Sequence, residues 1–171
     1  MEYLDTDTII FWASEDDDSG GDLLKKQKAQ WGPVLDFVRE KYQITPQISH
    51  NFLARPILQP AEREHLEKYL QSMNPWALCA FQNITESLKS FYLSLALSDG
   101  FIESEKAVAL SLLETSHQED KWGNVPWYHD VERADLCARV SSALIVFLTS
   151  FEQYQVKQVA DSAFMRSLSS Q

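Results

Sequence analysis

The sequence predicts a mainly α-helical fold, an orthogonal bundle of about five or six helices with one short N-terminal strand. Three observations favour this class. The chain has 171 residues, of which 44% are hydrophobic and 23% charged, as in a globular protein with a core. Apolar residues recur at steps of three and four along most of the chain, which is the periodicity of amphipathic helices. Proline and asparagine also stand at positions typical of helix starts.

The chain is predicted to have three parts. Residues 1–21 form a strand and an acidic loop, residues 22–165 the helical bundle domain, and residues 166–171 a frayed tail. The strand is expected over Tyr3–Trp12, which is rich in threonine and isoleucine. Because a lone strand is not stable in water, this segment must pair with a part that this sequence lacks or pack on the helices.

The first two helices have recognisable starts. Asp22 can cap a helix that runs to Tyr42, and Pro33 either interrupts that helix or begins its second half. A proline-containing linker over residues 43–59 leads to a second helix, which Pro60 opens.

The third helix carries the strongest pattern. Asn74 followed by Pro75 is a cap with proline in the first turn, and Asp99-Gly100 closes the helix. Its apolar stripe, which predicts one buried face, consists of Ala77, Phe81, Ile84, Leu88, Phe91 and Leu95.

A fourth helix is predicted over residues 103–121, with a turn at 122–124, and Pro126 or Asp130 then begins the last long helix. This last helix has two apolar rows, which is typical of a central, buried helix. One row is Val131, Ala134, Ala138, Ile145 and Leu148, and the other is Leu136, Val140, Leu144, Phe147 and Phe151.

The charge limits the classes of partner. A formal net charge of −10 does not suit binding to nucleic acid or to an anionic membrane, and favours a basic partner surface. The longest apolar run, Ala143 to Leu148, is far too short to span a bilayer, so no membrane insertion is expected. No targeting peptide is recognisable at the start. Cys79 and Cys137 lie in apolar helical patterns and are expected to be reduced core residues.

One pattern could bind a metal. The chain has two Glu-x-x-His pairs, a spacing that places both side chains on one helix face and that di-iron bundles use together with two single glutamates. Glu86 falls on the polar side of its helix, however, so chance is the preferred explanation. The set is Glu62/His65 and Glu114/His117, with Glu86 and Glu132 as the single glutamates.

No other pattern indicates catalysis. His129-Asp130 resembles an acid/base pair, but adjacent helical residues do not face each other, and Asp130 can serve as a helix cap. The chain has no Gly-rich phosphate loop, Cys-x-x-Cys pair or nucleophile elbow. We therefore expect no enzyme activity and no cofactor. A metal-dependent helical-bundle enzyme is the alternative.

Tryptophan is unusually frequent, with five residues in the chain. Trp76 lies at a helix start, and Trp122 and Trp127 flank one turn. Tryptophan is enriched at binding hot spots, although each of these residues taken alone is more often part of a core. Glu105 lies in a predicted first helical turn, where a carboxylate also complements the helix dipole.

A series of short motifs follows one order along residues 3–151. The motifs are Tyr3-Leu4-Asp5-Thr6-Asp7-Thr8, Trp31-Gly32-Pro33-Val34-Leu35, Asn74-Pro75-Trp76-Ala77-Leu78, Glu105-Lys106-Ala107 through Leu113-Glu114, Gln118, Trp122-Gly123, Trp127 and His129-Asp130. In this order the motifs resemble those of the ATP synthase F₁ complex assembly factor 2 family.

The resemblance implies a chaperone of the mitochondrial matrix that uses no nucleotide or metal. It would bind the unassembled alpha subunit of the ATP synthase F₁ sector and prevent its aggregation until the beta subunit joins. We expect the chain to act as a monomer. The predicted N-terminal strand would be the end of a β-rich portion that family members carry and this chain lacks. The resemblance and the tryptophans together give a partner-binding set of Glu105, Trp122, Trp127, Asp130 and Trp76.

Overall fold

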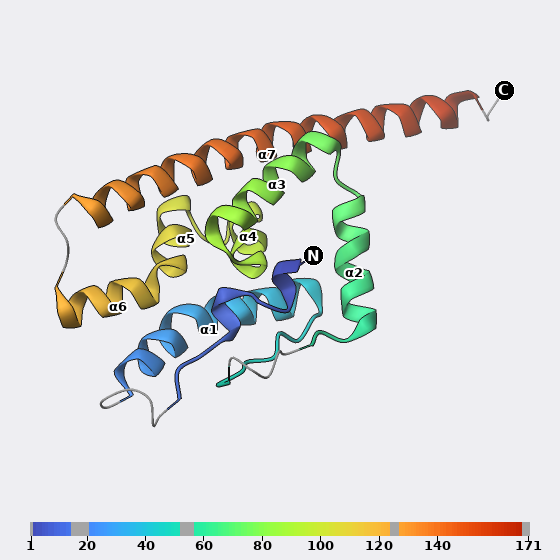
Figure 1. Ribbon diagram of the computed structural model, residues 1–171. Helices are drawn as coiled ribbons and strands as arrows, with labels where there is room; N and C mark the ends of the chain where they lie inside the picture. Colours follow the sequence, from blue (N-terminus) through green and yellow to red (C-terminus); the bar gives the residue numbers. More distant parts are fainter. Residues whose placement is uncertain (1, 15–20, 52–56, 124–126, 169–171) are drawn as a thin grey trace.

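The computed structural model describes residues 2–14, 21–51, 57–123 and 127–168, and it confirms a mainly α-helical fold (Figure 1). The described part contains seven α-helices and no β-strand. The helices are α1 (Asp22–Tyr42), α2 (Pro60–Gln71), α3 (Pro75–Leu88), α4 (Phe91–Ser98), α5 (Ser104–Ser111), α6 (Leu113–Trp122) and α7 (Tyr128–Leu168).

Two predicted helices are each divided in two, which explains why there are more helices than expected. The helix that begins at Pro75 ends at Leu88, because Lys89 adopts a left-handed backbone with φ of 52°. Ser90 then begins α4, and its side chain accepts a hydrogen bond from the Leu93 amide. The predicted helix over 103–121 is also divided, at Leu112, where a φ of −100° and a ψ of 13° separate α5 from α6.

The starts of the other helices follow the local signals closely. Asn74 accepts hydrogen bonds from the amides of Trp76 and Ala77, and Pro60 is the first residue of α2. Pro33 does not interrupt α1, which is continuous. The prediction that Asp22 caps α1 is wrong, because Asp22 is the first residue inside the helix and Gly21 precedes it with φ of 66°.

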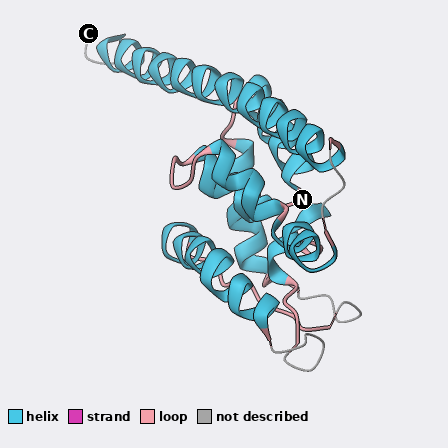
Figure 2. Ribbon diagram, turned by 90° about the vertical axis from the view of Figure 1, so that its left-hand side faces the viewer, coloured by secondary structure: helices cyan, strands magenta, loops and turns pink. Residues whose placement is uncertain are grey.

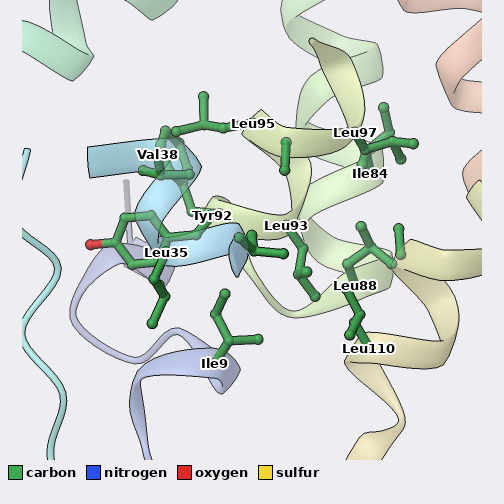
Figure 3. Close-up of a cluster of buried hydrophobic side chains, with 14 of the residues drawn as sticks. Ile9, Leu35, Val38, Ile84, Leu88, Tyr92, Leu93, Leu95, Leu97 and Leu110 are labelled. Atoms are coloured by element: carbon green, nitrogen blue, oxygen red, sulfur yellow. The ribbon is translucent and has the colours of Figure 1, made fainter. Parts of the chain in front are cut away.

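The centre of the core is α4, all eight residues of which are buried. Tyr92, Leu93 and Leu95 lie among side chains of α1, α3 and α5 (Figure 3). A helix that is apolar on every side must be surrounded, and α4 is packed against α1, α3, α5 and α7. The neighbouring buried side chains include Leu35 and Val38 of α1, Ile84 and Leu88 of α3, and Leu110 of α5.

The N-terminal strand is not formed. Two 3₁₀ turns, Glu2–Leu4 and Thr8–Ile10, take its place. Phe11 makes only an isolated bridge with Ser49, in which the Trp12 amide donates to the Ser49 carbonyl at 2.9 Å. Since the described residues offer no partner strand, the backbone groups of the segment bond partly within it and partly to other segments, and the segment packs on the helices.

Asp7 fixes this segment onto the core. Its buried Oδ2 accepts hydrogen bonds from the amides of Phe91 at 2.6 Å and Tyr92 at 3.0 Å, which are the first two amides of α4. Its Oδ1 accepts from the Ile9 amide at 3.1 Å. Thr8 donates from both its amide and its hydroxyl to the Lys89 carbonyl. The Asp-Thr-Asp-Thr motif therefore ties the N-terminal segment to the junction of α3 and α4.

The last helix, α7, is not central as predicted but crosses one side of the bundle (Figures 1 and 2). It packs on α3 and α5. Leu136, Val140 and Phe147, which belong to one predicted row, are buried. The other row faces solvent, and its Ile145 side chain is 64% exposed. The prediction failed because helices cover only one side of α7. No helix in the described ranges has the length and apolar character needed to cross a membrane.

Candidate partner-binding site

Three of the five tryptophans are on the surface. The side chains of Trp76, Trp122 and Trp127 are 73%, 79% and 81% exposed. For these three residues, the expectation that each is a core residue is wrong. Trp12 and Trp31 are buried, and each indole N–H donates a hydrogen bond, to the Ile9 carbonyl and the Leu110 carbonyl respectively. Large exposed indoles without such structural bonds are candidates for partner contacts.

Glu105 and Asp130 are also exposed. Glu105 lies in the first turn of α5 and Asp130 in the first turn of α7, where both carboxylates complement the helix dipole. Neither carboxylate has a hydrogen-bond or ion-pair partner among the residues that the structure describes. Both can therefore meet a basic group of a partner without first breaking an internal contact.

The start of α7 is held in place by α6. His129 Nδ1 lies 3.0 Å from Glu119 Oε1, and the guanidinium of Arg133 donates to the Ser116 hydroxyl at 3.2 Å. Trp127, immediately before α7, has a left-handed backbone with φ of 72°. A small hollow lies beside this tryptophan and is lined by Trp127, Val131, Glu132 and Asp135. We call this hollow the Trp127 notch.

A second hollow runs between α3 and α7, and we call it the α3–α7 groove. Its α3 side is formed by Asn83, Glu86 and Ser87, and its α7 side by Ala138, Arg139, Ser142, Ala143 and Val146. The two helices run in opposite directions. Asn74 at the start of α3 donates to the Ser150 carbonyl at 2.7 Å, whereas Ser87 near the end of α3 lies opposite Ala138.

The structure brings only part of the predicted set together. Trp122 is the last residue of α6, and Trp127 and Asp130 lie at the start of α7, where His129 contacts Glu119 of α6. Trp76 lies next to Asn74, which contacts α7 at Ser150. Ser150 is twenty residues beyond Asp130, which corresponds to about 30 Å of helix. Trp76 therefore belongs to the far end of α7, beside the groove. The groove was not predicted from the sequence, because it depends on how α3 packs on α7.

The proposed metal-binding pairs have structural roles. Glu62 accepts from the amides of Thr45 and Gln59, which closes a capping box at the start of α2. Glu114 accepts from the side-chain amide of Gln27, and burial raises the pKa of its carboxyl. Within the described ranges, no group of three or more His, Cys, Asp and Glu side chains is placed to hold a metal ion. This geometry gives the metal-enzyme alternative no support.

The two cysteines lie in different environments: Cys137 packs against the core as expected, whereas Cys79 does not. Cys79 is exposed on α3 and Cys137 is partly buried on α7. The side-chain amide of Asn83 donates to the Cys79 carbonyl and lies 3.7 Å from its sulfur. Cys79 therefore borders the face of α3 that lines the groove, and the prediction that it is a core residue is wrong.

Comparison with known proteins gives relatives but no matching family model. The chain is 32% identical over 151 residues to the mitochondrial protein Atp12 of Schizosaccharomyces pombe, a match that covers 85% of this chain and 50% of the relative. The crystal structure of Atp12 from Paracoccus denitrificans has a similar fold, with a TM-score of 0.77, 22% identity, and coverage of 87% and 61% of the two chains. A candidate chaperone from Agrobacterium tumefaciens gives a TM-score of 0.69 at 22% identity, covering 87% of this chain and 53% of that one. The chain spans about half the length of the curated relatives it matches.

Proposed function

Because the chain belongs, over 85% of its length, with the ATP12 family of ATP synthase assembly factors, we propose that it is a chaperone for assembly of the F₁ sector. In this proposal it binds the unassembled alpha subunit and prevents its aggregation until the beta subunit replaces the chaperone. The observation that supports it most strongly is the exposure of three tryptophans and an apolar row of α7 on an acidic helical body.

The proposed chaperone has to protect an exposed interface of the client and later release it. An unassembled subunit exposes an apolar interface patch that would otherwise drive aggregation. A chaperone must cover that patch with a few strong anchors and still release it when the true partner competes. Exposed Trp122 and Trp127 can supply the anchors, and surrounding carboxylates such as Asp130 can attract and orient a basic client surface.

The proposal also assigns a cellular location to the chain and client binding to one of its domains. The relatives from two yeasts are named as mitochondrial proteins, and we place this chain in the mitochondrial matrix. We assign client binding to the helical bundle domain, residues 22–165, and propose that it acts as a monomer without cofactor. Of the predicted frayed tail, residues 166–171, the first three belong to α7, and residues 169–171 lie outside the described residues. The acidic loop predicted at residues 15–21 lies outside the described residues except for Gly21.

The first test is light scattering of freshly diluted F₁ alpha subunit, with and without an equimolar amount of this chain. The proposal expects the chain to suppress the rise in scattering. An equimolar acidic protein of similar size and unrelated fold is the control for non-specific crowding. Unchanged aggregation in the presence of the folded chain would contradict the proposed function.

Glu105→Lys tests the proposed role of this carboxylate. If Glu105 pairs with a basic group of the client, reversal of its charge should weaken binding about tenfold or more, which is the loss of one charge-assisted contact. Glu67→Lys is the matched control, because Glu67 is another exposed helical glutamate without a partner in the described part of the chain. Equal affinity of the two variants would exclude a specific role for Glu105.

A further inference from the structure

We infer that one face of α7 is the seat for an amphipathic α-helix of the client, with a basic residue of that helix at the Trp127 end. The inference rests on the proposed function and identifies the surface and the client element that it would use. The face is formed by Val131, Asp135, Ala138, Ser142 and Val146, and we call it the α7 strip.

Helical spacing makes the two hollows one continuous surface. The members of the α7 strip follow one another at steps of four, three, four and four residues, and such positions share one side of a helix. The Trp127 notch opens along the first part of the strip and the α3–α7 groove along the second part. Val131 and Val146 are fifteen residues apart, which is about 22 Å or four helical turns. A client helix of four turns would therefore fit along the strip.

The middle of the strip admits close approach of another helix. Ala138 and Ser142 are small and exposed, and the Ser142 hydroxyl is already satisfied by the Ala138 carbonyl at 2.7 Å. Small side chains one turn apart allow a second helix backbone to come near, as at ordinary helix–helix contacts. The valines at the two ends, Val131 with 61% and Val146 with 43% of the side chain exposed, supply apolar surface that a partner can bury.

The distribution of charge indicates at which end of the strip the basic residue of the client helix lies. Asp130 and Glu132 at the Trp127 end are carboxylates with no partner among the described side chains. Asp135 and Arg139 neutralise each other at 2.8 Å. From Val140 to Ser150 the sequence has no charged residue, and Glu86 on the α3 side of the groove accepts a hydrogen bond from Gln82 at 2.8 Å. An arginine or lysine of the client can thus meet the two free carboxylates and lie against the indole face of Trp127, while an uncharged segment covers the other end.

The same charges argue against a second copy of this chain as the occupant. Two copies carry net charges of −10 each, so their association would bring two acidic bodies together. Trp76 extends the apolar surface at the opposite end of the strip. It lies seven residues before the groove residue Asn83 on α3, and residues two turns apart share a helix face.

The test uses variants that change the strip without touching the core. Ala138→Tyr fills the groove from an exposed position, and Ala61→Tyr makes the same change on the exposed surface of α2. Glu132→Lys reverses a free carboxylate of the notch, with Glu67→Lys as its control. We measure the concentration of each variant that halves the light scattering of diluted F₁ alpha subunit, after urea unfolding has shown that each is folded.

We expect Ala138→Tyr and Glu132→Lys each to raise this concentration about tenfold, whereas the two control variants match the wild type. A second readout uses the native thiols. Bound alpha subunit should slow iodoacetamide alkylation of Cys79, which borders the groove, and leave Cys137 on another side of α7 unchanged.

The outcomes separate the two proposals. If both strip variants keep the activity of the wild type and Cys79 is not protected, the inference that the α7 strip binds the client is wrong. The proposed function is unaffected by that result. If the wild type itself fails to suppress aggregation, the proposed function falls, and the assigned client falls with it. If Ala138→Tyr instead changes the oligomeric state measured by light scattering of the chain alone, the strip is a self-association surface and the inference is wrong.

Discussion

Two helices of this protein, α4 and α7, are both rich in apolar residues on more than one side, yet they lie in opposite environments. Every residue of α4 is buried among other helices. In α7 the Leu136, Val140 and Phe147 side is buried, while Ile145 and Leu148 on the other side remain 64% and 44% exposed. Apolar residues all round a helix therefore indicate either a core or a surface kept apolar for a partner. Only the neighbouring helices distinguish the two.

The largest expected effect is on the buried helix. Leu93→Ala in α4 removes a fully buried side chain and leaves a cavity, so the free energy of unfolding should fall by about 2–5 kcal/mol. Urea unfolding followed by far-UV circular dichroism measures this change. A loss below about 1 kcal/mol would mean that α4 can collapse around the cavity, and the contrast with α7 would weaken.

The second effect concerns Asp7, whose buried carboxyl group accepts hydrogen bonds from the first two amides of α4. Asp7→Ala would leave the buried amides of Ile9, Phe91 and Tyr92 without their acceptor. Unsatisfied buried donors cost about 1–3 kcal/mol each, but the variant also relieves the burial of a polar carboxyl group, so we expect a net loss of about 2 kcal/mol at pH 5. Asp5→Ala is the control, since Asp5 pairs with Arg63 at a partly exposed position and should cost less.

The pH dependence of the stability should also depend on Asp7. Burial raises the pKa of the Asp7 carboxyl from 3.8 to about 6, against the lowering effect of the hydrogen bonds it accepts. The folded state therefore holds the proton more tightly than the unfolded state. The stability from this protonation is fully present below pH 3.8 and is lost as the pH rises through about 6.

The measurement is the difference in unfolding free energy between wild type and Asp7→Ala at several pH values from 4 to 7. This difference should shrink as the pH rises and then level off above about pH 7, because ionisation is then complete. A difference that grows with pH would show that the hydrogen bonds to the ionised carboxylate outweigh its burial.

Local signals predicted the starts of α2 and α3, whereas tertiary contacts decided where the longer predicted helices break. The caps at Asn74 and Gln59 depend on residues within one turn, so the starts of α3 and α2 could be predicted. The break at Lys89 could not, because lysine has no preference for a left-handed backbone. There, the Lys89 carbonyl accepts hydrogen bonds from distant Thr8.

The candidate site, like the fold, could be predicted from the sequence only in part. The predicted residues Trp76, Trp122 and Trp127 could be proposed as partner contacts from their type, but their exposure depends on which side of each helix is covered. The α3–α7 groove arises only because α3 lies antiparallel on α7, a pairing fixed by contacts such as Asn74 to Ser150. No periodicity within one helix specifies such a pairing. For this reason the second apolar row of α7 was assigned to the core.

The smallest expected effect is on the exposed row of α7. Leu148→Ala is the same chemical change as Leu93→Ala, but the side chain is already 44% exposed and alanine favours the helix slightly. The free energy of unfolding should change by less than about 1 kcal/mol in the urea experiment. A loss as large as that of Leu93→Ala would show that this row contributes to the core. A small loss means that the row can be altered with little effect on the fold, so its apolar character is not needed for folding.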